Sequence, residues 1–366
     1  KSQGAGETAV KSGSGEAAKL KSGIPKSGIK SSGEVKATKS SGEVKATKSK
    51  QSAGRTKSSA SGKKGSLGRS RSKVNDVSGA RIGFLGAGRM TEAIVKGMLK
   101  AGKVKAKQLY VAAKTTKNLD TFKVQGISTT TRSYDIFGKF DCDLVFLNVH
   151  GFVVRSCFKL GGTRPAPITT NYIPTRKRPI YILSLIGGIS LADIKTVLLN
   201  PETGDKYKVE MHRLVLNTSV AYGLGLGVLD IEPDSKKCNS LIRDLLQTLG
   251  KVEFLEVDQM DSACSLIGNG MAIVYYFISA LADGGFKMGL GKVKAVKLAT
   301  KSVQCAAQCL LESNKNPAEL RDAVTSPSGG AIYGIHALDK QDCASGIQAA
   351  VEACYKRIKE LVDVEK

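Results

Sequence analysis

The sequence Arg81-Ile82-Gly83-Phe84-Leu85-Gly86-Ala87-Gly88-Arg89-Met90-Thr91 decides the fold of this chain. Its apolar run from Ile82 to Leu85 has the length of a strand. After the glycines, apolar residues recur at helical spacing at Ile94, Val95, Met98 and Leu99. A strand, a tight turn and a helix fit the first part of the dinucleotide-binding fingerprint, because Gly86 permits the turn and Gly88 lets backbone N–H groups approach a diphosphate. The alternative is a turn of the same fold that has lost its ligand.

We predict that the cofactor-binding residues lie in this turn and after two later strands. The second strand ends at Ala112-Ala113-Lys114, where a site for NAD usually has a carboxylate that binds the ribose 2′-hydroxyl. Because a lysine stands there instead, a 2′-phosphate is better accommodated, so NADP(H) is favoured and NAD(H) is the alternative. The predicted set is Leu85, Gly86, Ala87, Gly88, Arg89, Met90, Lys114, Asn148 and Val149.

Further apolar runs of strand length alternate with segments of helical periodicity as far as residue 257. These runs are Leu109–Ala113, Leu144–Val149, Ile180–Leu185 and Arg213–Leu216. Strands that alternate with helices indicate parallel βαβ units, so residues 80–257 are predicted to form an α/β Rossmann-like, doubly wound sheet.

The strand signals stop at about Asp258, and residues 258–366 are predicted to form an all-α domain. Long helices are expected over Met260–Lys287, Lys292–Glu312 and Asp342–Val362, with a short helix at Pro317–Val324 and another after Gly329.

Residues 1–79 differ from the rest in composition. They consist largely of Lys, Ser, Gly, Ala and Thr, and the nonapeptide KSSGEVKAT occurs at Lys30–Thr38 and again at Lys39–Thr47. Up to Ala80 there are 18 Lys and Arg against 5 Asp and Glu, which is +13 of the chain's net charge of +24. Such a segment buries too little apolar surface to offset its ordering entropy, so we predict a disordered basic tail. It is either a solvated linker or a tether to nucleic acid or acidic surfaces.

Composition also bears on membranes, metals and location. No run of 18 apolar residues occurs, and the most apolar stretch, Met271 to Ala282, is expected to be too short to cross a bilayer, so no membrane partner is predicted. Eight cysteines without a C-x-x-C pair and three histidines predict reduced, ordinary buried thiols and no metal site. Because the tail has little amphipathic periodicity, it would be a poor transit peptide, and a cytoplasmic location is expected, with mitochondria as the alternative.

The C-terminal half contains a more specific pattern. It consists of Ala280–Leu290 (ALADGGFKMGL), Arg321–Pro327 (RDAVTSP) and Ile332–Leu338 (IYGIHAL), preceded by Asn217-Thr218. In order and spacing the chain from Arg81 onward resembles the pyrroline-5-carboxylate reductase family, except for extra residues around 161–177 and 203–208.

The resemblance implies a hydride transfer from NAD(P)H to the C=N carbon of Δ1-pyrroline-5-carboxylate, which gives L-proline. It implies a homodimer or higher homo-oligomer and a small-molecule substrate bound by a loop of the helical domain at Val324, Thr325, Ser326, Gly329 and Gly330. The cofactor carries the difficult step and the protein mainly positions it, so no catalytic acid or base is assigned.

Several positions depart from the family pattern. Ser328 stands at a glycine position, and Ala331 replaces a threonine whose hydroxyl binds the pyrroline nitrogen. Met271 lies in the turn that is Ser-Gly-Ser-Gly-Pro-Ala-Tyr in the family, and Asn148-Val149-His150-Gly151 stands for Ala-Val-Lys-Pro. Ser219 replaces the proline of Asn-Thr-Pro, while Ala113 and Ser133 replace residues near the cofactor.

These departures leave more than one interpretation open. The first is an active reductase, slow or altered in specificity, in which His150 is a drifted lysine position rather than a new catalytic acid. The second is a pseudoenzyme, an oligomeric scaffold whose basic tail provides the function. A third makes the tail's association with nucleic acid the main function, strengthened by avidity in the oligomer.

Overall fold

The structure is a computed structural model of the 366-residue chain. It describes residues 77–151, 153–154, 178–199, 208–232, 234–236 and 238–363. The predicted basic tail up to residue 76 lies outside the described residues, as do the extra residues 161–177 and 203–207. The predictions for these segments stay predictions.

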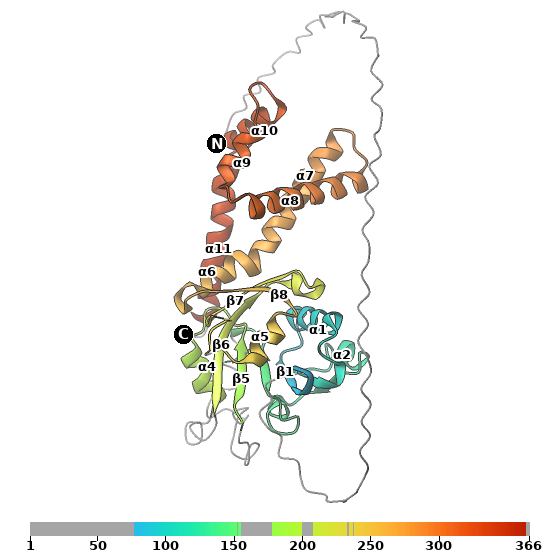
Figure 1. The fold of residues 1–366 in the computed structure, drawn as a ribbon, viewed down its shortest axis with the longest axis vertical. Helices are drawn as coiled ribbons and strands as arrows, with labels where there is room; N and C mark the ends of the chain where they lie inside the picture. Colours follow the sequence, from blue (N-terminus) through green and yellow to red (C-terminus); the bar gives the residue numbers. More distant parts are fainter. Residues whose placement is uncertain are drawn as a thin grey trace, which may run out of the picture. The chain divides into compact units, whose positions relative to one another are not determined.

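Eight described strands form one sheet in the order β3-β2-β1-β4-β5-β6-β7-β8 (Figure 1). Neighbours from β3 to β6 are parallel, β6 and β7 are antiparallel, and β7 and β8 are parallel again. The predicted Rossmann-like sheet is therefore confirmed, with one antiparallel pairing near its edge. The strands are β1 (Ile82–Leu85), β2 (Leu109–Ala112), β3 (Ser128–Thr130), β4 (Leu144–Leu147), β5 (Ile180–Ser184), β6 (Val209–Leu216), β7 (Gly225–Leu229) and β8 (Gly250–Phe254).

Helices connect these strands and make up the C-terminal part. The α-helices of the sheet domain are α1 (Arg89–Ala101), α2 (Asp120–Lys123), α4 (Leu191–Leu198) and α5 (Ser240–Leu246), and its described 3₁₀ turns are η1 (Val77–Gly79), η2 (Ala106–Gln108), η3 (Ser133–Ile136), η5 (Thr218–Tyr222) and η6 (Val257–Gln259). Helix α1 ends at Gly102, whose left-handed backbone (φ 72°) lets its N–H donate to the Leu99 carbonyl at 3.1 Å.

Three strands, β3, β7 and β8, were not predicted from the sequence. β3 is a polar segment of three residues, β7 contains two glycines, and β8 has no fully buried residue. Each therefore lacks the continuous apolar run that marked the other five strands. The antiparallel reversal between β6 and β7 was missed for the same reason.

The core of the sheet domain is apolar and closely packed. Phe84 of β1 and Phe146 of β4 are fully buried, with their rings stacked at a centroid distance of 5.1 Å. The fold begins before the predicted boundary at residue 80, because Val77 is buried in this core. The Gln108 amide donates to the carbonyl oxygens of Val77, Ser78 and Ala80 at 2.8–3.2 Å, which fixes this entry segment.

The helical part contains α6 (Met260–Ala263), the π-helical turn η7 (Cys264–Asn269), α7 (Gly270–Lys287), α8 (Lys292–Ser313), α9 (Pro317–Ala323), α10 (Gly330–Lys340) and α11 (Cys343–Asp363). The predicted helices are confirmed, except that Met260–Lys287 is divided by the π turn. Sequence periodicity gave no sign of this turn. Such turns are frequent at functional sites.

The segment Val257–Lys287 is long and apolar enough, by length and composition, to cross a membrane. The prediction that this stretch is too short is therefore wrong, because the helical segment continues on both sides of Met271–Ala282. Exposed cysteines also correct a prediction: Cys305 and Cys309 lie on the surface of the single chain, whereas Cys142 and Cys238 are buried.

Candidate active site

The glycine turn after β1 is built by close backbone contacts. Gly86 has φ +114°, and a Cβ atom at this residue would lie 2.2 Å from the Asn148 carbonyl oxygen. The Gly86 N–H donates to the Ala112 carbonyl, and the Asn148 N–H donates to the Leu85 carbonyl, both at 2.8 Å. Only glycine fits here, and the turn is fixed between the carboxyl ends of β2 and β4.

The N-terminus of α1 follows directly and is open. Gly88 is its N-cap residue and provides no side-chain cap, so the first backbone N–H groups of the helix have no capping acceptor. A Cβ atom at Gly88 would meet nothing within 4 Å. The turn thus has the free N–H groups, the space and the helix dipole that a diphosphate requires.

The other predicted cofactor residues lie beside the turn. Lys114 is exposed just after β2, and Asn148 and Val149 follow β4 with partly buried side chains. Since β2 and β4 are the two neighbours of β1, the structure brings the predicted cofactor set together at the carboxyl edge of the sheet. Leu85 itself is 2% exposed, so only its backbone is available to a ligand.

Thr91, at the third glycine position of the fingerprint, has a contact that sequence reasoning missed. Its side chain is fully buried, and its Oγ1 donates to the Gly86 carbonyl oxygen at 2.7 Å. The Asn148 Nδ2 donates to the same Oγ1 at 2.8 Å. Thr91 therefore connects the glycine turn with the end of β4.

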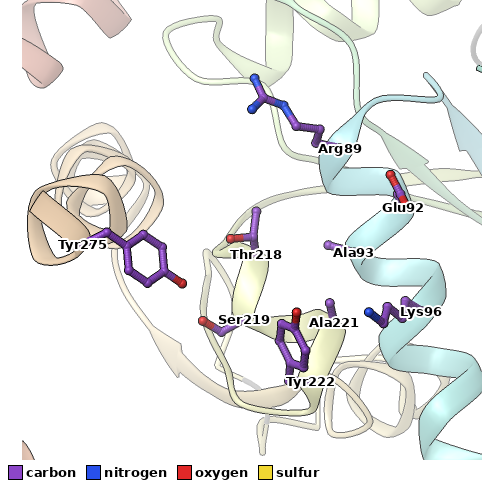
Figure 2. A pocket seen from close by; sticks show the side chains of 9 residues that line it. All are labelled: Arg89, Glu92, Ala93, Lys96, Thr218, Ser219, Ala221, Tyr222 and Tyr275. Atoms are coloured by element: carbon purple, nitrogen blue, oxygen red, sulfur yellow. The ribbon is translucent and has the colours of Figure 1, made fainter. Parts of the chain in front are cut away.

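An open pocket of about 330 Å³ adjoins the start of α1 (Figure 2). Figure 2 shows Tyr275 of α7 directed toward the η5 residues Thr218 and Ser219, and Lys96 beside Tyr222. The Lys96 ammonium lies 5.0 Å from the centroid of the Tyr222 ring. The pocket thus combines two cations, one carboxylate, hydroxyl groups and aromatic faces, and its lining is Arg89, Glu92, Ala93, Lys96, Thr218, Ser219, Ala221, Tyr222 and Tyr275.

Only Arg89 of this lining belonged to the predicted site residues. Thr218 was visible in the sequence as part of the Asn217-Thr218 motif, but nothing along the chain indicated Tyr275. Ser219 Oγ also lies 4.0 Å from Met271 Sδ. These two residues occupy the two proline positions of the family pattern, so two departures contact each other across η5 and α7.

The predicted substrate residues form the loop between α9 and α10. Thr325 Oγ1 donates to the Arg321 carbonyl at 2.7 Å, and a Cβ atom at Gly329 would lie 2.3 Å from Ser326 Oγ. Ser328 has φ +58°, a left-handed conformation that explains why a glycine is usual at this position. Val324, Ser326 and Gly330 are exposed.

Within one chain this loop is not joined to the glycine turn. Among the described elements, α10 packs on α11, and neither α9 nor α10 packs on α1 or β1. No residue of α9 or α10 is buried. The structure therefore brings each predicted set together, but not the two sets with each other in a single chain.

A buried ion cluster connects the sheet with the helical part. Arg213 of β6 contacts Asp261 of α6 at 2.5 Å, and Lys359 of α11 pairs with the same carboxylate. Gly188, after β5, donates its N–H to Asp261 at 3.1 Å. Burial opposes the charged carboxylate, but the hydrogen bonds from Arg213 and Lys359 outweigh it and lower the pKa of Asp261 to about 2.

Comparison with known proteins identifies the family. A family model for pyrroline-5-carboxylate reductase dimerisation matches residues 257–361, and one for "NADP oxidoreductase coenzyme F420-dependent" matches residues 81–164. Pyrroline-5-carboxylate reductase 3 of Rattus norvegicus is 34% identical over 281 residues, which is 77% of this chain and 96% of the relative. The protein of that name from Danio rerio is 31% identical, over 80% of this chain and 94% of its own.

The chain belongs to the pyrroline-5-carboxylate reductase family. Solved structures agree: Plasmodium falciparum pyrroline carboxylate reductase with NADP bound superposes with a TM-score of 0.65 at 20% identity, covering 78% of this chain and 99% of its own. The Coxiella burnetii pyrroline-5-carboxylate reductase gives a TM-score of 0.59 at 26% identity, covering 77% and 98%. The resemblance predicted from the sequence is thus confirmed, and with it the class of nicotinamide-dependent oxidoreductases.

The dimerisation match also accounts for the exposed apolar helices. It includes α7, α8 and α10, on which Tyr276 is 78%, Leu298 51% and Tyr333 69% exposed in the single chain. Such a surface on one chain indicates an interface, and the match supports homo-oligomerisation. Among the described residues, no group of three or more His, Cys, Asp or Glu side chains could hold a metal ion.

Proposed function

We propose that this protein is an NADPH-dependent pyrroline-5-carboxylate reductase that forms L-proline. The observation that carries the proposal is the open, uncapped start of α1 at Gly88, directly beside the pocket that Arg89 lines. A bound nicotinamide supplies the hydride. The chain's own part is to hold the diphosphate with the N–H groups of the turn and to hold the imine beside it.

The pocket residues suit a small cyclic imine that carries a carboxylate. Arg89 and Lys96 supply positive charge, and Thr218, Ser219 and Tyr275 supply hydroxyl donors. Ala331 lacks the hydroxyl that binds the ring nitrogen in the family, which leaves that nitrogen short of one donor at a cost of about 1–3 kcal/mol. We therefore expect a reductase that is slow rather than inactive.

NADP(H) is proposed as the preferred nucleotide. Lys114 follows β2 with an exposed side chain, and no carboxylate stands at Ala112-Ala113-Lys114 to bind a ribose 2′-hydroxyl. The Lys114→Glu variant should lower the preference for NADPH over NADH at least tenfold, measured as the ratio of the two kcat/KM values. An unchanged ratio would contradict this role for Lys114.

We further propose that each site takes its glycine turn from one subunit and its Ser326 loop from the partner subunit. Three observations favour this arrangement. The loop does not pack on α1 or β1 within a chain, Ser326 and Gly330 are exposed, and the helical part carries the dimerisation match.

Two variants that fit the fold can test this. A Cβ atom at Gly88 or at Gly330 would meet nothing within 4 Å, so Gly88→Val and Gly330→Phe are expected to keep the fold while filling the diphosphate and substrate positions. Each variant alone should oxidise NADPH with pyrroline-5-carboxylate at a small fraction of the wild-type rate. When the two chains are co-expressed, half of the dimers are mixed and one of their two sites is intact, so about a quarter of the wild-type rate should return.

The possible results of this experiment distinguish the shared site from a site within one chain, and the reductase proposal from an inactive scaffold. If the mixture stays inactive, sites lie within single chains and the shared arrangement is wrong. If the wild-type protein binds neither NADPH nor NADH and oxidises neither with pyrroline-5-carboxylate, the reductase proposal itself fails and a scaffold without activity is left.

A further inference from the structure

The hydrogen bonds around Thr91 allow only one orientation of the Asn148 side chain. The Gly86 carbonyl can only accept, so the single hydroxyl hydrogen of Thr91 is used at the 2.7 Å contact with it. The side-chain atom of Asn148 that lies 2.8 Å from Thr91 Oγ1 must then be a donor. The amide nitrogen therefore faces Thr91, and the amide oxygen faces away.

The same bonds set the direction of the peptide at the tip of the turn. In a trans peptide the carbonyl of Gly86 and the N–H of Ala87 point in opposite directions. Because the buried Thr91 hydroxyl holds the Gly86 carbonyl, the Ala87 N–H is directed away from Thr91. In the described part of the chain, no group accepts a hydrogen bond from it.

Thr91 and Asn148 both depart from the expected sequence pattern, and their hydrogen-bonding groups are complementary. Thr91 stands where the fingerprint has a third glycine, and Asn148 stands where the family sequence has alanine. Either change alone would add a polar group to a tightly packed place, since Thr91 is fully buried and the Asn148 carbonyl lies against Gly86. Together, Asn148 Nδ2 donates to Thr91 Oγ1 while the Thr91 hydroxyl donates to the Gly86 carbonyl.

We propose that Thr91 and Asn148 are a pair of positioning residues that hold the Gly86–Ala87 peptide with its N–H presented to the cofactor diphosphate. The pair acts through the turn and touches no reacting atom, and the inference rests on the proposed nucleotide site. Loss of the pair frees the peptide to rotate, so part of the binding free energy is spent on ordering it. The pair should therefore govern the affinity for nucleotide and leave the rate at saturation nearly unchanged.

The test measures NADPH dissociation constants by fluorescence titration on the full chain without substrate, followed by KM for NADPH and kcat. Thr91→Val removes the hydroxyl at constant shape, and Asn148→Ala restores the family residue. Asn148→Asp turns an acceptor toward a hydroxyl that has no hydrogen left to give. Each should raise the dissociation constant about tenfold, with kcat within about twofold of wild type. Thr91→Ser, which keeps the hydroxyl, should bind nearly as the wild type does.

A double variant completes the test. If the two residues act as a pair, Thr91→Val with Asn148→Ala should bind NADPH no more weakly than the weaker single variant. The proposal is overturned if the three damaging variants bind within about twofold of wild type, or if the two single effects multiply in the double variant. It is overturned too if kcat falls as far as affinity does. A wild-type protein that binds no NADPH would instead refute the nucleotide site, and this inference with it.

Discussion

The two halves of this chain differ in how they bury their apolar side chains. The sheet domain encloses large ones, such as Phe84, Phe122 and Phe146, within the single chain. Between α7 and α8 the buried contacts are made by the small residues Ala282, Ala295 and Ala299, while larger apolar residues face outward. The first half can thus form its core alone, whereas the second needs a partner chain to cover it.

The largest effect is expected in the core of the sheet domain. Phe146→Ala removes a fully buried ring that stacks on Phe84, so the free energy of unfolding should fall by about 3–5 kcal/mol. Val124→Ala, at a residue that is 89% exposed, is the control and should change it little. Urea unfolding followed by circular dichroism measures both; equal effects would mean that this core is not closely packed.

A slightly smaller loss of stability is expected where the sheet domain joins the helical part. Asp261→Asn leaves the buried Arg213 without its anionic partner, which should cost about 3 kcal/mol of stability. Asp283→Asn, in an exposed pair with Lys292, is the matched control within the helical part and should change the unfolding midpoint very little. A small effect of Asp261→Asn would show that the halves are held together by other contacts.

The same junction should weaken in acid. The pKa of Asp261 is about 2 in the fold against about 3.9 in the unfolded chain, so its charge stabilises the protein above pH 4 by about 3 kcal/mol. That contribution is lost as the pH falls from about 4 to 2. The stability difference between wild type and Asp261→Asn should therefore shrink over this window, as measured by denaturant midpoints at stepped pH. A constant difference would contradict the lowered pKa.

Breaking the interface should separate chains without unfolding the sheet domain. Tyr276→Glu places a charge on the exposed apolar face of α7 and should weaken dimerisation at least tenfold, or about 1.4 kcal/mol. Light scattering across a dilution series measures the dissociation, with Lys103→Gln on the sheet domain as a control of equal charge change. If the oligomer of the α7 variant is unaffected, this face of α7 is not the interface.

The smallest effect concerns the entry to the fold. Val77→Ala trims a buried side chain at the N-terminal edge of the core and should lower stability by about 1 kcal/mol. A chain that starts at residue 77 should unfold like the full chain, whereas one that starts at residue 81 loses three carbonyl partners of Gln108 as well. Equal midpoints for the two truncated chains would place the boundary at residue 80, as the composition had suggested.

The sequence was informative where a local pattern determines the structure. The bounds of β1 agree with the apolar run that predicted it, and α9 begins where Asn316 and Glu319 form a capping box and Pro317 is the first helical residue. β7 was missed because its alternate residues are glycines that neighbouring residues closely approach, a constraint that appears only in the folded sheet.

The site was predictable only in part, for a related reason. The glycine turn and the Ser326 loop are continuous in sequence and were found. The contacts of Thr91 with Asn148 and of Ser219 with Met271 join residues 57 and 52 positions apart, so each residue by itself seemed a defect. Two departures from the family pattern that are in contact can compensate for each other, and only the three-dimensional structure shows which departures are in contact.

The partners of the Asp261 carboxylate are synthesised at different times. Its partners Gly188 and Arg213 precede it along the chain, but Lys359 follows 98 residues later. The ribosome has therefore released the whole sheet domain long before it delivers the third partner. The contact of α11 with this carboxylate forms only after Lys359 has been synthesised, so a chain that terminates before that residue leaves the carboxylate with one cation instead of two.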